Sequence, residues 1–160
     1  MSASTTTRGW CGSSPRSGKT MTKIDEVGKK LLNAAAKTQR NAYVLWGFAV
    51  GASVLSEDGK IYEGCNVESW ISGLGVCAER NAVNHAVLHG NRKISKVALV
   101  MDEKNGAEVR PCGACLQYIE TFAADQKMVI LMAKTRRGNV LLDTVEAKEL
   151  RELLPLPYRK

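Results

Sequence analysis

The chain has 160 residues, 44% of them hydrophobic and 24% charged, which is the composition of an ordinary globular domain with its own core. The formal net charge of +7 favours anionic partners in general, but no basic run with interleaved aromatic residues accompanies it, so a nucleic acid is not the expected partner. The longest apolar stretch, residues 43–55, is too short and too rich in glycine to span a bilayer, so no membrane association is expected.

Residues 1–20 are rich in Ser, Thr, Gly and Arg and have no hydrophobic periodicity. We expect this segment to be disordered or added during cloning, although its composition also weakly resembles an organelle transit peptide. Residues 12–20 come near a phosphate-binding P-loop, but the glycine spacing is one residue too long and no strand precedes it. With five cysteines and no apolar leader, we expect a reduced, cytoplasmic protein whose folded domain covers residues 21–160.

The first expected element is a helix over residues 22–37. Thr22 is a suitable N-cap, and Ile24, Val27 and Leu31 form an apolar stripe at helical spacing. We interpret this helix as a packing element without a direct role in chemistry.

Two strands are expected next, over residues 48–55 and 60–67, joined by an Asp-Gly turn that is typical of a hairpin. Strand alternation places Asn66 and Glu68 on the same side of the second strand. The pattern alone leaves open whether this polar pair is a solvated rim or a ligand-binding pair.

The second half of the chain alternates helical and strand patterns. Helices are expected over residues 77–89, 111–122 and 145–154, and strands over residues 96–101, 128–133 and 140–145. Pro111 is expected at the first position of its helix, where proline is favoured. This order indicates an α/β protein: a three-layer α/β/α sandwich with a five-stranded mixed sheet.

Three cysteines and one glutamate stand at the expected starts of two helices. Cys77 and Glu79 open one helix, and Cys112 and Cys115 lie one turn apart at the start of another. Three thiolates can bind Zn²⁺ and leave one coordination position open for water, which is typical of a catalytic zinc site, and Glu79 is then free to carry protons. A structural zinc site and a redox Cys-x-x-C pair are the alternatives.

A histidine pair, His85 and His89, lies four residues apart on the expected helix over residues 77–89. That spacing is compatible with metal binding. With no third ligand evident beside them in the sequence, we interpret both as surface or core histidines.

Two stretches, CAER at residues 77–80 and PCGACLQ at residues 111–117, resemble the zinc signature of the cytidine deaminases, in the small homotetrameric branch with three cysteine ligands. The resemblance extends from Tyr43 to Tyr158 and includes the strand-like segments 48–52 and 64–68. It implies the cytidine deaminase fold and the zinc-dependent deamination of cytidine or deoxycytidine to uridine or deoxyuridine, with release of ammonia, in pyrimidine salvage.

The resemblance also implies the chemistry of the site. Cys77, Cys112 and Cys115 would hold the zinc, and Glu79 would carry protons from water to the ring nitrogen and to the leaving ammonia. Three thiolates on one zinc dication leave a net negative site, which positive or hydrogen-bonding groups near the sulfurs should offset, and Arg80 and the two helix N-termini are the candidates.

The same resemblance implies the substrate contacts. Phe48 would pack on the pyrimidine, Asn66 and Glu68 would hydrogen-bond the ribose, and the backbone around Ala78 would read the base edge. Tyr158 stands where the family has a phenylalanine that reaches a neighbouring subunit's pocket, so a homotetramer is implied.

Several residues depart from the family pattern. Leu116 replaces an arginine that usually follows the last cysteine, with Arg110 as a candidate substitute. Ser72 and Gly73 replace a common tyrosine and proline, and the segment 43–47 is one residue short. These departures leave the substrate open, so a modified cytosine nucleoside is an alternative, as in the related blasticidin S deaminases. A non-catalytic zinc-stabilised module for RNA or protein, and a deaminase of single-stranded nucleic acid, are further alternatives.

Overall fold

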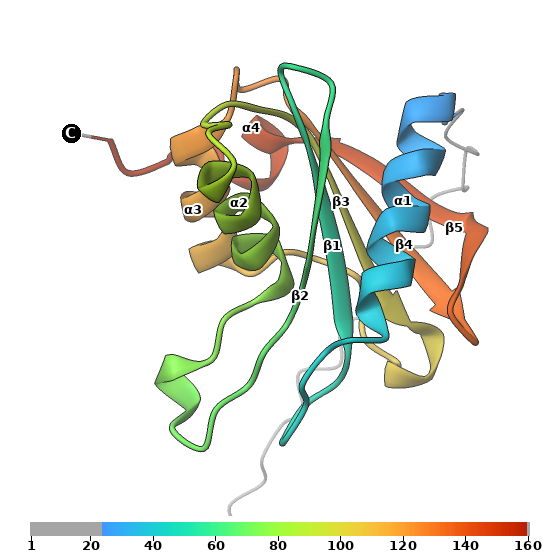
Figure 1. Ribbon diagram of the computed structural model, residues 1–160. Helices are drawn as coiled ribbons and strands as arrows, with labels where there is room; N and C mark the ends of the chain where they lie inside the picture. The colour runs from blue at the N-terminus through green and yellow to red at the C-terminus, as the bar shows by residue number, and fades with distance from the viewer. Residues whose placement is uncertain (1–23, 160) are drawn as a thin grey trace, which may run out of the picture.

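The computed structural model describes residues 24–159. Figure 1 shows the four α-helices and five β-strands of this part of the chain. In chain order they are α1 (Glu26–Gln39), β1 (Val50–Ser56), β2 (Ile61–Cys65), α2 (Ala78–Leu88), β3 (Ile94–Asp102), α3 (Gly113–Phe122), β4 (Val129–Arg136), β5 (Asn139–Glu149) and α4 (Leu150–Leu153). Two short 3-10 helices, η1 (Ser72–Leu74) and η2 (Glu103–Asn105), lie in connecting loops.

The five strands form one mixed sheet in the order β2-β1-β3-β4-β5. β1 pairs antiparallel with β2 and with β3, β3 pairs parallel with β4, and β4 pairs antiparallel with β5. The hairpin between β1 and β2 turns at Gly59, whose φ of 82° is a conformation that favours glycine. The parallel pair requires a long crossover connection, which α3 supplies.

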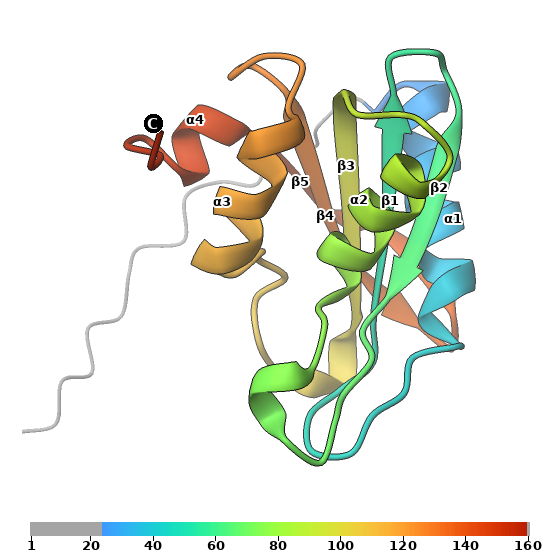
Figure 2. The ribbon, with the colours of Figure 1, turned by 60° about the vertical axis from the view of Figure 1, so that its left-hand side comes forward.

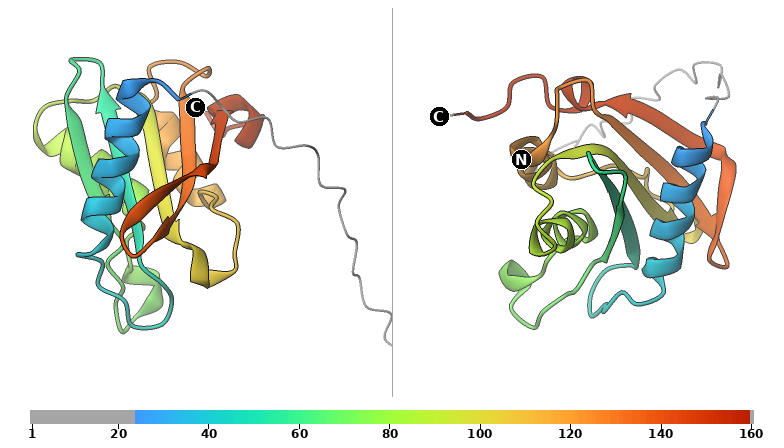
Figure 3. Two further views of the ribbon diagram at one scale, coloured as in Figure 1. Left: turned by 90° about the vertical axis from the view of Figure 1, so that its right-hand side faces the viewer. Right: turned by 45° about the horizontal axis from the view of Figure 1, so that its top comes forward.

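The helices cover both faces of the sheet, as the views in Figures 1, 2 and 3 agree. Leu31 and Leu32 of α1 pack on one face against residues that include Val100 of β3. Val83 of α2 and Ile119 of α3 pack on the opposite face in a second core cluster. β3 is therefore buried on both sides, which explains its near-continuous apolar sequence. The predicted α/β/α sandwich with a five-stranded mixed sheet is confirmed.

The expected helix over residues 145–154 is mostly wrong. β5 continues to Glu149, because residues 146–149 pair with Met132 back to Val129 of β4, and only Leu150–Leu153 is helical. The side chains of Glu149 and Glu152 form a capping box that starts this short helix.

Two expected helix starts also move. α1 begins at Glu26 and not at Thr22, because the Asp25 side chain caps it by accepting a hydrogen bond of 2.6 Å from the Gly28 amide. Pro111 precedes α3, because Cys112 takes the extended N-cap conformation, with φ −72° and ψ 162°.

The expected disordered or added segment 1–20, its near P-loop and its transit-peptide resemblance lie outside the described residues. Among residues 24–159 the structure contains no helix that is both long and apolar enough to cross a membrane.

Candidate functional site

Three thiols converge where α2 and α3 begin. Cys77 is the N-cap of α2, Cys112 is the N-cap of α3, and Cys115 lies in the first turn of α3. Their sulfur atoms all lie within 4.8 Å of one another. The starts of α2 and α3 therefore meet, since crossover connections bring both helices to the same face of the sheet.

The three sulfurs suit a tetrahedral zinc ion. Zn–S bonds of about 2.3 Å at tetrahedral angles place sulfur atoms about 3.8 Å apart, and the observed separations of up to 4.8 Å need only a small side-chain contraction. Cys77 lies at the N-terminus of α2, where the partial positive charge of the helix end lowers a thiol pKa. A hydrogen bond with Cys115 and the Arg80 guanidinium lower the pKa of Cys77 to about 5, against the effect of its burial.

Arg80 supplies the positive charge beside these sulfurs. Its Nη2 lies 3.9 Å from the Cys77 sulfur and donates to the Gly75 carbonyl at 3.1 Å. Its buried Nε has no hydrogen-bond partner within the described residues, so the contacts of this guanidinium are those of Nη2 with the Gly75 carbonyl and the Cys77 sulfur. The hydrogen bond to Cys77 raises the pKa of Arg80, so the charge is permanent.

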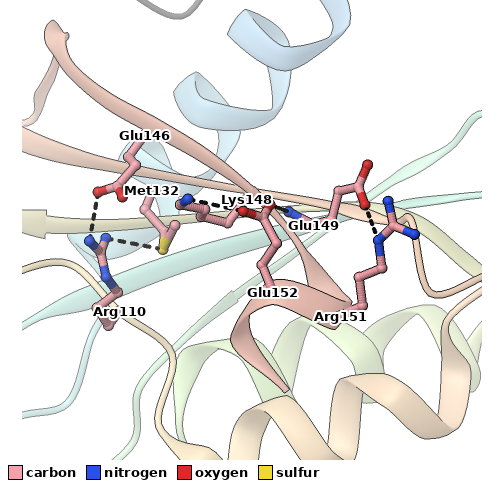
Figure 4. Close-up of polar contacts among 7 residues, drawn as sticks. All are labelled: Arg110, Met132, Glu146, Lys148, Glu149, Arg151 and Glu152. Atoms are coloured by element: carbon pink, nitrogen blue, oxygen red, sulfur yellow. Dashed lines mark hydrogen bonds and ion pairs between the residues drawn. The ribbon is translucent and has the colours of Figure 1, made fainter. Parts of the chain in front are cut away.

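Arg110 does not replace the missing arginine at position 116. Figure 4 shows its guanidinium directed at Glu146, with a separation of 2.7 Å, and at the sulfur of Met132, at 3.6 Å. Leu116 is buried in the core beneath α3. Arg80 is the cation that contacts the thiol cluster.

Glu79 is the buried acid of the site. Its exposed fraction is 5%, and burial raises its pKa to about 7, with a further upward contribution from the charge of Cys77. A carboxyl group with a pKa near neutrality can both accept and release a proton at physiological pH, which suits a general acid and base.

A cavity of about 290 Å³ opens beside Glu79 and the thiols. Four predicted substrate contacts line it: Phe48, Asn66, Glu68 and Ala78. Cavities of about 300 Å³ and above are typical of small-molecule sites. These residues are far apart in the sequence but close in space, because the loops before β1 and after β2 lie side by side (Figure 2). The Tyr43 amide of the first loop donates a hydrogen bond to the Asn66 carbonyl of the second.

Other lining residues were not predicted to face the cavity, among them Leu99, Met101, Glu108 and Arg110, the last of which was expected only as a cation near the thiols. Leu99 and Met101 belong to β3, whose apolar run gave no sign that its end faces a cavity. Glu108 and Arg110 stand just before Cys112, and this proximity to a candidate ligand is the signal that could have identified them.

The polar pair Asn66 and Glu68 orders the loop that carries Phe48. Asn66 accepts a hydrogen bond from the Val50 amide at 2.8 Å and donates one to the Phe48 carbonyl at 3.0 Å. The Glu68 carboxylate accepts from the amides of Leu45 and Trp46, both at 2.6 Å. The pair is thus a structural part of the cavity wall as well as a candidate ligand.

Tyr158 does not line the cavity of its own chain. Its side chain is 72% exposed, and its backbone is held by Gln117, which donates to the Tyr158 carbonyl at 3.0 Å and accepts from its amide at 2.7 Å. The Tyr158 side chain therefore lies away from the cavity and open to contact with another molecule.

Known proteins similar to this chain include zinc-binding deaminases. A family model described as "Cytidine and deoxycytidylate deaminase zinc-binding region" matches residues 25–132. A cytidine deaminase of Sporosarcina psychrophila is 37% identical over 133 residues, which cover 82% of this chain and 91% of that protein. A Blasticidin-S deaminase of Bacillus cereus is 29% identical over 69% of this chain and 77% of its own length. The crystal structure of a cytidine deaminase from Burkholderia pseudomallei is similar with a TM-score of 0.70 and 30% identity, covering 81% of this chain and 98% of that one.

Proposed function

This chain belongs to the cytidine and deoxycytidylate deaminase family, and we propose that it deaminates cytidine and deoxycytidine to uridine and deoxyuridine, with release of ammonia, in cytoplasmic pyrimidine salvage. It is a zinc-dependent enzyme. The observation that carries the proposal is the buried carboxyl of Glu79, which lies beside three clustered thiols on the wall of a cavity of nucleoside size.

Zn²⁺ is the cofactor, and Cys77, Cys112 and Cys115 would hold it. When bound, the ion supplies a Lewis acid that lowers the pKa of water towards neutrality. Arg80 offsets the surplus negative charge of three thiolates, because its guanidinium lies 3.9 Å from the Cys77 sulfur.

Glu79 carries the protons of the reaction. Water adds to the amino-bearing carbon of the cytosine ring, and the carbon–nitrogen bond to the amino group then breaks. As a carboxylate, Glu79 accepts one proton from the attacking water and delivers it to the ring nitrogen. It then accepts the second proton from the added hydroxyl group and delivers it to the amino group, which leaves as ammonia. Its pKa of about 7 makes both directions accessible near neutral pH.

The remaining cavity residues orient the nucleoside. Phe48 packs against the pyrimidine, and the backbone at Ala78 reads the base edge. The Oε1 atom of Glu68 takes no part in the bonds to the loop amides, and Asn66 has a second amide hydrogen, so both can still bind ribose hydroxyls. The sugar then docks on the groups that order the loop.

In this proposal the protein is a homotetramer, and the Tyr158 side chain of a neighbouring subunit enters the cavity and completes the site. Two exposed aromatic side chains support an assembly: Trp46, next to the lining residue Gly47, is 64% exposed and Trp70 is 78% exposed, and their rings pack edge to face with centroids 5.6 Å apart. Exposed aromatic clusters of this kind mark interaction surfaces.

The test is the loss of cytosine absorbance when zinc-loaded protein is mixed with cytidine, deoxycytidine, free cytosine or blasticidin S. Turnover of cytidine and deoxycytidine is the expected result. A modified cytosine nucleoside is the second candidate, favoured by the similarity to a Blasticidin-S deaminase, and turnover of blasticidin S alone would replace the first proposal with it. Bound zinc without turnover of any of these compounds would indicate a non-catalytic binding module instead.

A further inference from the structure

The far end of α2 carries an imidazole pair that the deaminase reaction does not use. His85 and His89 lie one helical turn apart, and both are exposed. At 1.5 Å per residue, His85 lies about 12 Å along the helix from Cys77. The pair is therefore separate from the thiol cluster at the start of the same helix.

Both rings have the same nitrogen committed to a backbone carbonyl. The Nδ1 atom of His85 lies 2.9 Å from the Glu63 carbonyl oxygen, and the Nδ1 atom of His89 lies 2.9 Å from the His85 carbonyl oxygen. A carbonyl only accepts hydrogen bonds, so each Nδ1 carries the proton and each Nε2 of the neutral ring keeps a free lone pair. Histidines that bind metals have this arrangement, with the non-ligating nitrogen donating to a carbonyl or carboxylate.

The spacing of the two rings fits a shared ion. A metal about 2.0–2.1 Å from Nε2 lies about 3.2 Å from the ring centroid, so two imidazoles at octahedral to tetrahedral angles have centroids about 4.5–5.2 Å apart. The centroids of His85 and His89 are 4.9 Å apart, with the ring planes inclined by 64°.

Tyr62 of β2 holds both rings in place. Its ring centroid lies 5.3 Å from that of His85 and 5.6 Å from that of His89. Tyr62 is itself buried, and its hydroxyl is 2.6 Å from the side-chain amide of Asn91. This support lowers the entropy that the pair would lose on binding an ion.

We propose that His85 and His89 form a second metal site, which binds a borderline divalent transition ion such as Ni²⁺, Cu²⁺ or Zn²⁺. Imidazole nitrogen suits these ions, whereas Mg²⁺ and Ca²⁺ select oxygen ligands. The two Nε2 atoms are the protein ligands, and water fills the other positions. The site stands on its own geometry and does not depend on the reaction at Glu79.

The test is Ni²⁺ titration of zinc-loaded enzyme by calorimetry, with nickel and zinc per chain counted after desalting. The expected result is one equivalent of Ni²⁺ bound without loss of zinc. H85Q and H89Q should each lose that equivalent while keeping one zinc per chain and cytidine turnover. L88Q is the matched control, because Leu88 is 82% exposed on the same turn, and it should bind Ni²⁺ like the parent.

Two results would overturn the proposal. One is Ni²⁺ uptake that both histidine variants retain, which would place the ion elsewhere in the chain. The other is absence of Ni²⁺ uptake by the parent enzyme. A lower melting temperature in H85Q and H89Q would then show that the pair only packs on Tyr62 and caps the helix end.

Discussion

The guanidinium of Arg80 lies 3.9 Å from the sulfur of Cys77, three residues earlier on the same helix. The start of α2 therefore supplies a thiol and the positive charge that stabilises its thiolate, while Glu79 lies between them in the sequence. The cluster does not depend on an arginine at position 116, and Leu116 is free to pack in the core. Leu116 removes the arginine that the family usually has after the last cysteine, and Arg80 is the cation that contacts the thiols in the described residues.

Replacing Arg80 with glutamine should weaken zinc binding by about 10–100-fold, the usual effect of losing a group that supports metal ligands. Competition against a chromogenic chelator measures this affinity. R80K is the matched control, because lysine keeps the charge but cannot keep the contacts of a guanidinium to both the Gly75 carbonyl and the Cys77 sulfur. We expect it to fall between R80Q and the parent, and parent-like zinc affinity in R80Q would contradict the role.

Acid should loosen the loop that Glu68 holds. The amides of Trp46 and Leu45 donate to this carboxylate and lower its pKa below the ordinary value of 4.5. The stabilisation is therefore fully present above the unfolded-state pKa and is lost as the pH falls through the lower folded-state pKa. Trp46 fluorescence should change only in that acid range, and E68Q should show the loosened signal at neutral pH together with a raised KM. Tryptophan fluorescence that is the same in E68Q and the parent at every pH would contradict this role of Glu68. W46F is the control that identifies the contribution of Trp46 to the fluorescence.

The contact between α2 and β2 should tolerate no added methyl group at Gly64. A Cβ there would lie 2.2 Å from the Ala82 amide nitrogen and 2.5 Å from the Ala78 carbonyl oxygen, which are both backbone atoms. G64A should lower the free energy of unfolding by about 1–3 kcal/mol and displace the helix that begins at Cys77. Denaturant melts of G64A and of G73A, where nothing lies within 4 Å of an added Cβ, measure the effect. Equal stability of the two variants would contradict this packing.

Shared sites should allow two defective subunits to complement each other. E79Q lacks the proton carrier, and Y158A lacks the exposed side chain that we propose to enter a neighbour's cavity. Co-expressed subunits include sites with an intact Glu79 and a partner's intact Tyr158, so mixed oligomers should be more active than either variant alone. Activity no greater than the average of the two pure variants would argue against a shared site.

The clustering of the three cysteines follows the sequence more closely than the bounds of the elements around them. The candidate ligands and Glu79 are local features, because Cys77-x-Glu79 and Cys112-x-x-Cys115 lie within single helix turns. Glu, Ala and Lys at residues 146–149 favour a helix, but pairing with β4 overrides that preference. The bonds from Glu68 to the amides of Leu45 and Trp46 join segments more than 20 residues apart, and no local pattern encodes them.

The measurement that tests the account most directly is cytidine turnover by E79Q, with zinc counted in the same sample. E108Q is the matched control, because Glu108 also lines the cavity but lies on the exposed loop before Cys112. The account predicts one zinc per chain in both variants, near-parent turnover in E108Q, and a loss in E79Q of about 10²–10⁴-fold or more, since proton transfer runs through that carboxyl. Turnover in E79Q close to that of the parent, with zinc retained, would contradict it.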